Sequence, residues 1–150
     1  MKYSKTSLDL VNKFEGCELK AYRDLGGVLT IGYGHTLGVY EGQTITLDQA
    51  EQYAKEDLSI AESEVNNLVT VPLSQDEFDA LVDFVFNLGE GNFARSSLLV
   101  LLNKKQYFAA ALQFERWDKC GGIIVAGLLR RRVAEHKLFM EDDNGCQKTA

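Results

Sequence analysis

Residues 15–36, Glu-Gly-Cys-Glu-Leu-Lys-Ala-Tyr-Arg-Asp-Leu-Gly-Gly-Val-Leu-Thr-Ile-Gly-Tyr-Gly-His-Thr, mark the point where the sequence changes from a helical to an extended pattern. Upstream of this stretch, apolar residues recur at helical spacing, which predicts a helix over residues 4–14. Gly16 can adopt the left-handed conformation that commonly ends a helix, so Glu15 is expected on the last helical turn.

The second half of the stretch has the pattern of a small sheet. Gly26-Gly27 marks a turn, and residues 28–33 then alternate in the manner of a strand, so that Val28 and Thr30 share one face. Further glycines interrupt the run soon afterwards. We therefore predict two or three short antiparallel strands between residues 18 and 40, which form a small sheet and not a sheet domain.

The rest of the chain is helical in pattern. Capping-box sequences begin at Thr46 and Ser74, and the first precedes a long amphipathic helix that reaches about Leu68, roughly 30 Å in length. Further helices are predicted from the second box to Gly89 and over residues 98–103, 106–117 and 126–140, with a loop at 120–122.

These elements indicate an α+β fold that is mostly helical. A small β-hairpin lobe is predicted at about residues 14–48, and a linking helix at about 47–68 joins it to a helical lobe. The helical lobe covers about residues 74–145 and includes the N-terminal helix, so residues 1–150 form one domain. A cleft between two such lobes is a common place for a ligand site.

Composition places the chain among globular proteins, with 150 residues of which 45% are hydrophobic. No apolar run approaches the ~20 residues of a membrane span, and the first residues lack the apolar segment of a signal peptide. We therefore expect no stable membrane insertion, and synthesis and retention in a cytoplasm. The net charge of −6 argues against a nucleic-acid partner, because such partners are bound by basic surfaces.

The cysteines and histidines form no recognisable metal or disulfide motif. Cys17, Cys120 and Cys146 are odd in number and lack CxxC spacing, and the two histidines, His35 and His136, lie far apart in the sequence. We predict neither a metal site nor a cofactor. His35 is interpreted as a buried structural residue, and Cys17 as a small buried residue in preference to a regulatory thiol.

Glu15, Asp24 and Thr30 are the candidate catalytic residues. Hydrolysis of a glycosidic bond requires one carboxyl group that donates a proton and a second that is ionised. Glu15 suits the first role, because the end of a helix and partial burial disfavour a carboxylate anion. Asp24 lies in a polar loop and suits the second role, and Thr30 could hold a water molecule. With 22 acidic residues in the chain, the spacing alone favours a helix-end acid and a turn former over a catalytic pair.

The order of motifs resembles that of the phage-type lysozymes, the endolysin muramidases of glycoside hydrolase family 24. The N-terminal part of the resemblance consists of Glu15-Gly16, Leu19-Lys20-Ala21-Tyr22-Arg23-Asp24 and Thr30-Ile31-Gly32-Tyr33-Gly34-His35-Thr36. It continues through Phe86-Asn87-Leu88-Gly89 with Phe93, Ser97-Leu98-Leu99, Leu102-Asn103, Trp117, Gly121-Gly122, Gly127-Leu128 and Arg131-Arg132 with Glu135. The likeness covers nearly the whole chain and implies a lysozyme-like fold.

The resemblance implies a bacteriolytic glycoside hydrolase that cleaves the β-1,4 bond between N-acetylmuramic acid and N-acetylglucosamine in peptidoglycan, with inversion. Glu15 would be the general acid, Asp24 the general base or electrostatic partner, and Thr30 would position the attacking water. Inversion calls for roughly 6.5–9.5 Å between the two carboxyl groups, so that water fits beside the sugar.

Three more residues match positions that line the sugar cleft in this family: Thr36, Phe86 and Ser97. Phe86 fits the buried face of its own helix equally well by periodicity. A fourth cleft position falls near Ala111, whose side chain cannot form a hydrogen bond. Sugar contacts at that position are therefore in doubt.

The implied partners are the glycan strands of peptidoglycan. The resemblance also implies accumulation in the host cytoplasm, release to the wall through a separate holin-like membrane protein, and host cell lysis. No large apolar seam is evident, which favours a monomer. The alternatives are a non-hydrolytic wall-binding module, a lytic transglycosylase that forms an anhydro sugar, and a chitinase-like enzyme with a different substrate.

Arg130-Arg131-Arg132 is the densest basic cluster in the chain. We interpret it as a solvated helix face with some ion pairing, on a helix whose apolar side is predicted at Leu128, Leu129, Val133 and Leu138. The alternative is a positive rim on the cleft. Such a rim would help a protein of net charge −6 to bind an anionic cell wall.

Overall fold

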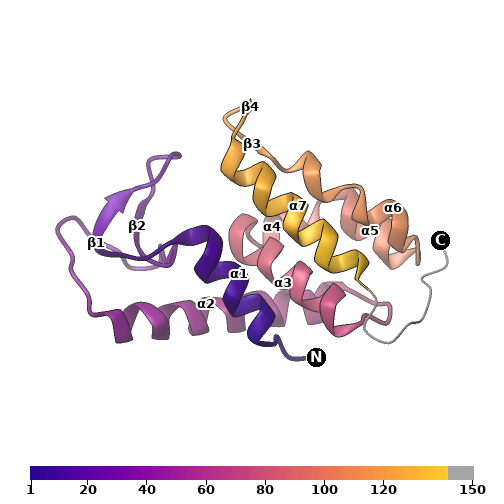
Figure 1. Ribbon diagram of the computed structural model, residues 1–150, viewed down its shortest axis with the longest axis horizontal. Coiled ribbons are helices and arrows are strands. Elements are labelled where there is room, and N and C mark those ends of the chain that lie inside the picture. Colours follow the sequence, from indigo (N-terminus) through magenta and orange to yellow (C-terminus); the bar gives the residue numbers. More distant parts are fainter. Residues whose placement is uncertain (142–150) are drawn as a thin grey trace.

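The computed structural model describes residues 1–141 and shows a mostly helical α+β protein (Figure 1). Its elements are α1 Lys5–Glu15, β1 Glu18–Arg23, β2 Leu29–Gly32, α2 Leu47–Leu68, α3 Gln75–Leu88, α4 Glu90–Ala94, α5 Ser97–Asn103, α6 Tyr107–Ala111, the 3-10 helix η1 Phe114–Arg116, β3 Lys119–Cys120, β4 Ile123–Ile124 and α7 Ala126–Met140. The predicted fold class is confirmed. Cys146 and the predicted end of the helical lobe at residue 145 lie outside the described residues.

The small lobe is built around β1 and β2, which pair in antiparallel fashion with Tyr22 opposite Thr30. A shift of register interrupts the pairing near the start of β1, as a β-bulge does. Residues 43–45 take the place of a third strand on the other side of β1, through a bridge between Lys20 and Thr44. The predicted small sheet is therefore confirmed, with two full strands and one bridged segment.

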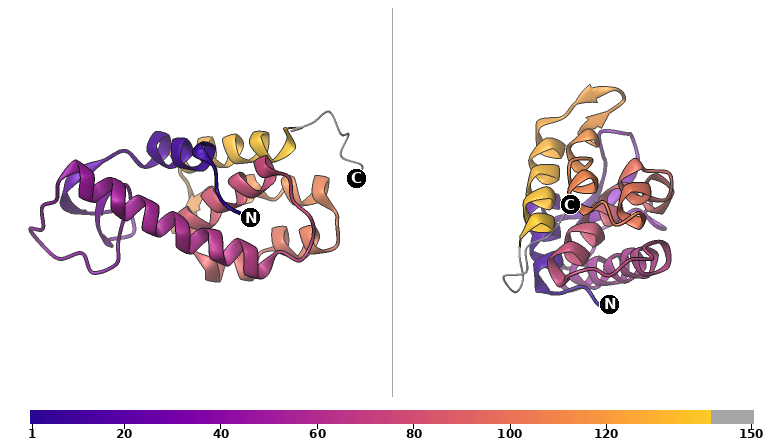
Figure 2. Two further views of the ribbon diagram at one scale, coloured as in Figure 1. Left: turned by 90° about the horizontal axis from the view of Figure 1, so that it is seen from below. Right: turned by 90° about the vertical axis from the view of Figure 1, so that its right-hand side faces the viewer.

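Helix α2 runs from the small lobe along the helical lobe (Figure 2). Its 22 residues span about 33 Å at 1.5 Å per residue. The predicted capping box is present, because the Gln49 amide donates to the Thr46 hydroxyl at 3.2 Å and the Gln49 side chain accepts from the Thr46 amide at 2.9 Å. Its buried face consists of Ala50, Ala54, Leu58, Ala61, Glu62 and Val65. This one helix therefore contributes to both lobes.

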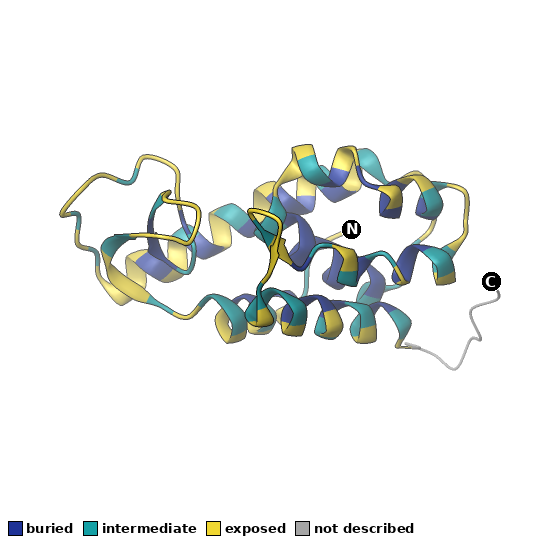
Figure 3. Ribbon diagram, turned by 90° about the horizontal axis from the view of Figure 1, so that it is seen from above, coloured by how far each residue is buried: buried dark blue, intermediate teal, exposed yellow. Residues whose placement is uncertain are grey.

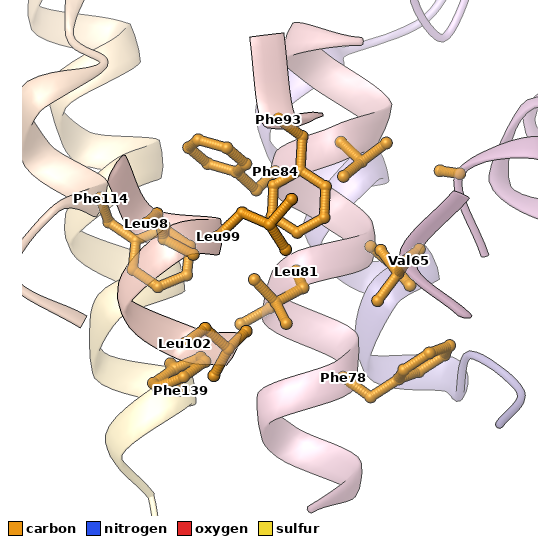
Figure 4. Packing of buried hydrophobic residues seen from close by; sticks show 14 of the residues in the cluster. Val65, Phe78, Leu81, Phe84, Phe93, Leu98, Leu99, Leu102, Phe114 and Phe139 are labelled. Atoms are coloured by element: carbon orange, nitrogen blue, oxygen red, sulfur yellow. The ribbon is translucent and has the colours of Figure 1, made fainter. Parts of the chain in front are cut away.

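The main core surrounds α3 in the helical lobe, where buried residues concentrate, while most loops of the small lobe are exposed (Figure 3). The Phe84 ring meets Phe93, Phe114 and Trp117 edge to face, at centroid distances of 6.1, 5.4 and 6.0 Å. Figure 4 shows Phe84, Phe93 and Phe114 of this cluster beside leucines of α3 and α5. Each such aromatic pair contributes about 0.5–1.5 kcal/mol beyond the area it buries.

One prediction for the C-terminal half is wrong, and another missed a pair of short strands. The segment 106–117 is not one helix but the short α6 followed by η1, a turn that buries the Phe114 side chain completely. The loop predicted at 120–122 is the turn of the β3–β4 hairpin, in which Gly121 and Gly122 both have positive φ. Two positive φ angles in succession are what a two-residue type I′ turn requires.

Helix α7 begins and ends where the sequence predicts, but it turns a different face to the interior. The buried residues are Arg131, Arg132, Glu135 and Phe139. The residues predicted to face inward are half-buried or exposed: Leu128, Leu129, Val133 and Leu138. The prediction failed because it assumed that the interior face is apolar, whereas this one is ionic. The interpretation of Arg131 and Arg132 as solvated is therefore wrong.

We predict that Phe84→Ala lowers the free energy of unfolding by about 3–5 kcal/mol, because it leaves a cavity among three aromatic rings. Phe108→Ala is the matched control, since the Phe108 side chain is 54% exposed. It is expected to change stability by less than about 0.5 kcal/mol. Urea unfolding measures both, and equal losses in the two variants would contradict the described core.

Candidate active site

Glu15 is the last residue of α1, as predicted, and Gly16 caps the helix with φ 64° and ψ 177°. That backbone conformation is essentially restricted to glycine. The Glu15 carboxylate is mostly buried, and its Oε1 accepts a hydrogen bond from Arg131 Nη1 at 2.5 Å. A cation from α7 therefore lies against the candidate acid, which the sequence pattern does not predict.

The second oxygen of Glu15, Oε2, lies directly against the backbone of Gly34. A Cβ atom at residue 34 would stand 2.6 Å from this oxygen, and φ at Gly34 is +80°. The turn that presents Gly34 is closed by mutual backbone hydrogen bonds of 2.9 Å between Ile31 and His35. Only glycine fits here, because any side chain would displace the carboxylate.

His35 has the structural role predicted for it. Its Nδ1 is 2.8 Å from Asp57 Oδ2, and its ring stacks on Tyr53 at a centroid distance of 4.3 Å. Burial raises the pKa of Asp57, and the hydrogen bond and charge of His35 only partly offset this. The pair fixes the Ile31–His35 turn on α2 and so holds Gly34 in place.

Asp24 lies in the turn after β1, as predicted, and it is exposed. Its Oδ1 accepts hydrogen bonds from the amides of Gly26 and Val28, both at 2.9 Å. Within residues 1–141, no group forms a hydrogen bond with Oδ2. One oxygen thus anchors the carboxylate, and the other is left for solvent or substrate.

Thr30 is buried on β2 and is linked to Asp24 through a single residue. The Thr30 hydroxyl donates to the Val28 carbonyl at 2.9 Å, while the Val28 amide donates to Asp24. Tyr22, opposite Thr30 on β1, lies within the electrostatic range of both acids. Burial raises the pKa of Tyr22, and the negative charges of Glu15, Glu18 and Asp24 add to the shift. The structure therefore brings the three predicted catalytic residues around Tyr22.

The Glu15–Gly34 contact lies between two hollows. On one side is a cavity of about 180 Å³, lined by Gly34, the predicted sugar-binding residues Thr36 and Phe86, and residues of α2, α3 and α4. On the other side is a groove of about 820 Å³ that includes Glu15 and runs between α1 and α7. The cavity therefore borders Gly34 and the groove borders Glu15, the two residues of this contact.

The remaining predicted cleft positions differ in their exposure. Ser97 is exposed in the first turn of α5, where a ligand can reach it. Ala111 is completely buried at the end of α6, so no sugar contacts its side chain. Phe86 is half-buried, packs against the core and also lines the smaller cavity. Both predictions made for Phe86 are therefore consistent with its position.

The arginine cluster forms a buried ionic network instead of a solvated face or a rim of three cations. Asp83 on α3 receives two hydrogen bonds from Arg131, at 2.9 Å from Nε and 2.8 Å from Nη2. Burial raises the pKa of Asp83, but the charge and hydrogen bonds of Arg131 outweigh it, so the net shift is downward. Arg132 pairs with Glu135 at 2.8 Å and stacks over the Phe84 ring. Of the three arginines, only Arg130 is exposed.

The cysteines that the structure describes, Cys17 and Cys120, are half-buried free thiols, so Cys17 is less buried than predicted. Within the described residues, no three His, Cys, Asp or Glu side chains are grouped in a way that could hold a metal ion. Residues 1–141 also contain no helix that is both long and apolar enough to cross a membrane.

Comparison with known protein families gives a match to the phage lysozymes over residues 12–135. The endolysin of Salmonella phage P22 is 41% identical over 93% of this chain and 99% of its own length. The endolysin of Bacillus phage PZA is 42% identical over 93% of this chain, and the chain spans 55% of that longer protein.

Solved structures agree with these relatives. The muramidase domain of SpmX from Asticaccaulis excentricus matches with a TM-score of 0.86 at 36% identity, over 94% of this chain and 99% of that domain. A variant of P22 lysozyme matches with a TM-score of 0.78 at 40% identity, over 94% and 99% of the two chains.

We predict that Asp83→Asn lowers the free energy of unfolding by about 3–5 kcal/mol, because it leaves the buried Arg131 guanidinium without its main counter-charge. Asp9→Asn is the matched control, since it breaks an exposed pair with Lys5. The control should cost about 0.3–0.5 kcal/mol. A loss below 1 kcal/mol for Asp83→Asn in urea unfolding would contradict the importance of this ion pair.

Proposed function

The chain belongs to the phage lysozyme family of muramidase-type glycoside hydrolases, and we propose that it cleaves the β-1,4 bond between N-acetylmuramic acid and N-acetylglucosamine in bacterial peptidoglycan. One observation carries the proposal: Glu15 Oε2 lies at the Gly34 backbone between two hollows. A glycan strand that passes from one hollow to the other would place a glycosidic oxygen beside this atom.

In the proposed reaction, Glu15 is the general acid. Oε1 is held by Arg131, so Oε2 carries the proton that the leaving glycosidic oxygen receives. The bond from Arg131 fixes the carboxyl plane, and Gly34 allows the sugar to approach. This positioning of a proton donor beside the scissile bond is the main requirement of acid-catalysed glycoside cleavage.

Asp24 and Thr30 supply the attacking water in this proposal. The Thr30 hydroxyl donates its one hydrogen bond to the Val28 carbonyl, so it can only accept a hydrogen bond from water. Asp24 Oδ2 accepts the other proton of the same water and removes it during attack. The water then directs a lone pair at the anomeric carbon, on the face opposite the Glu15 proton. Attack from that face gives inversion.

The cavity beside Gly34 is the proposed sugar site on one side of the scissile bond. Phe86 offers an aromatic face and Thr36 a hydroxyl, which together suit the mixed apolar and polar surface of a sugar. Ser97, exposed on α5, is proposed as a further contact along the glycan. Ala111 has no part in this site, because it is buried.

Family membership also supports a biological role as a phage endolysin. We propose that the protein is a monomer without a cofactor, and that it is made and accumulates in the host cytoplasm. A separate holin-like membrane protein then gives it access to the wall, and wall hydrolysis lyses the host cell.

Glu15→Gln is predicted to lower the rate of peptidoglycan hydrolysis by about 10²–10⁴-fold, because glutamine has no proton to donate. The control is Glu18→Gln, an exposed residue of β1, which should keep wild-type activity. Release of reducing ends from purified peptidoglycan gives the rates. Mass spectrometry of the wild-type products must show a gain of water. Anhydro ends would identify a transglycosylase, and binding without cleavage would identify a wall-binding module.

Gly34→Ala is predicted to lower kcat by about 10²-fold, because the new Cβ displaces the Glu15 carboxyl group from the scissile bond. Gly38→Ala separates this effect from backbone strain. Gly38 also has a positive φ, of +72°, but a Cβ there meets no atom within 4 Å. Both variants should lose similar stability in thermal unfolding, and only Gly34→Ala should lose activity. Equal activities would contradict the role of the close contact.

A further inference from the structure

Tyr22 on β1 stands beside the residues proposed to supply the attacking water. It is the register partner of Thr30 on β2. Directly paired residues of an antiparallel sheet project from the same face, with Cβ atoms about 4.5–5.5 Å apart. Because tyrosine has the longer side chain, its hydroxyl extends further from the sheet than the Thr30 hydroxyl. A small molecule bound to Thr30 would therefore lie alongside Tyr22.

The Tyr22 hydroxyl is free to bind such a molecule. Within residues 1–141 it forms no hydrogen bond with another group of the protein. Solvent reaches it, because the buried polar atoms that lack a partner in this part of the chain belong to Arg132 and Glu135. Tyr22 is thus a half-buried phenol whose O–H group is available to a ligand.

The charges around Tyr22 favour the role of a donor. Its electrostatic neighbours are Glu15, Glu18 and Asp24, and all three are acids. Burial raises the pKa of the Tyr22 phenol, and these negative charges raise it further. The phenol therefore keeps its proton at any pH at which Asp24 is ionised and Glu15 still carries a proton.

The two arginines near these acids are engaged in ion pairs. Arg23 donates to the Glu41 carboxylate at 2.7 Å. Arg131 donates to Glu15 through one nitrogen and to Asp83 through the other two. Tyr22 is therefore a donor that this group of side chains has left for a ligand.

The attacking water needs one donor in addition to its two acceptors. In the proposed reaction it gives one hydrogen to Thr30 and the other to Asp24, and it directs one lone pair at the anomeric carbon. Its second lone pair has no partner among these residues. Ionised Asp24 only accepts, the Thr30 hydrogen is used by the Val28 carbonyl, and the Glu15 proton goes to the leaving oxygen.

This requirement leads to our further inference, which rests on the proposed function. We propose that Tyr22 is a fourth catalytic residue, whose hydroxyl donates a hydrogen bond to the second lone pair of the attacking water. The water is then held at three points, which fixes its remaining lone pair on the anomeric carbon. Tyr22 keeps its proton throughout. The water gives its proton to Asp24 and its oxygen to the anomeric carbon, while the leaving oxygen takes the proton of Glu15.

The first test removes the hydroxyl and keeps the ring. Tyr22→Phe is compared with Tyr40→Phe, which removes a hydroxyl from a tyrosine of the small lobe that is 63% exposed. Thermal unfolding checks that both variants are folded. Release of reducing ends from purified peptidoglycan then gives kcat and KM for each.

The second test separates the water from the acid. Fluoride leaves without a proton, so hydrolysis of the β-fluoride of N-acetylglucosaminyl-N-acetylmuramic acid does not need the proton of Glu15. This substrate is given to Tyr22→Phe and to Tyr22→3,5-difluorotyrosine, which keeps the phenol but lowers its pKa. A phenolate cannot donate, so activity should be lost as the pH rises through the pKa of the phenol. Ultraviolet absorption measures that pKa independently.

We expect Tyr22→Phe to lower kcat about tenfold on both substrates with KM unchanged, as for the loss of one hydrogen bond, and Tyr40→Phe to match the wild type. On the glycosyl fluoride, the fluorinated protein should equal the wild type at low pH and lose activity at a lower pH than the wild type does, at its own phenol pKa. Loss of activity in both proteins at the same pH would overturn the proposal.

Three kinetic results for Tyr22→Phe would also contradict the proposal. A higher KM with kcat unchanged would identify a sugar contact, and a loss on peptidoglycan alone would identify an effect on Glu15. Wild-type kcat on both substrates would leave Tyr22 without a role, although the proposed function would stand. If the wild type cleaves neither substrate, the proposed function fails, and this inference fails with it.

Discussion

The ion pair between Asp83 and Arg131 is the interaction on which the rest of the site depends. It joins α3, at the centre of the core, to α7, and the remaining nitrogen of Arg131 reaches Glu15 at the end of α1. The three residues are separated by 48 and 116 positions along the chain. Because Asp83 and Arg131 are almost completely buried, neither can lose the other without leaving an unpaired charge. The candidate acid is thus anchored to the core, although it borders solvent.

The features that the sequence predicted well are those with local causes. The capping boxes at Thr46 and Ser74 are both present, and Gly16 and Gly89 cap the helices that end there. Each of these depends on residues within four positions of one another. The α+β class followed from the same signals, and the placement of Glu15, Asp24 and Thr30 on a helix end, a turn and a strand followed from short-range pattern.

The features that the sequence did not predict have long-range causes. Periodicity assigned the inner face of α7 to leucines and valine. It carries no information about Asp83 on α3, the carboxylate whose hydrogen bonds to Arg131 make that arginine a buried residue. Gly34 was noted only as a break in a strand, since its contact with Glu15 exists only after folding. The family pattern gave a cleft position near Ala111, but here the chain turns after α6 and buries it. The link from Asp24 to Thr30 through the Val28 backbone is likewise visible only in the folded structure.

Gly16 has a mechanical consequence. Glu15 belongs to a helix that is fixed to the helical lobe, while Asp24 and Thr30 belong to the small lobe, and Gly16-Cys17 is the short connection between α1 and β1. Any rocking of one lobe against the other therefore changes the distance between Glu15, the proposed proton donor, and the pair Asp24 and Thr30, proposed to hold the attacking water. Because Asp24 and Thr30 are both hydrogen-bonded to the backbone of Val28, any such motion displaces the two together. The backbone at Gly16, in a conformation that other residues do not readily adopt, therefore helps to set the distance between Glu15 and this pair.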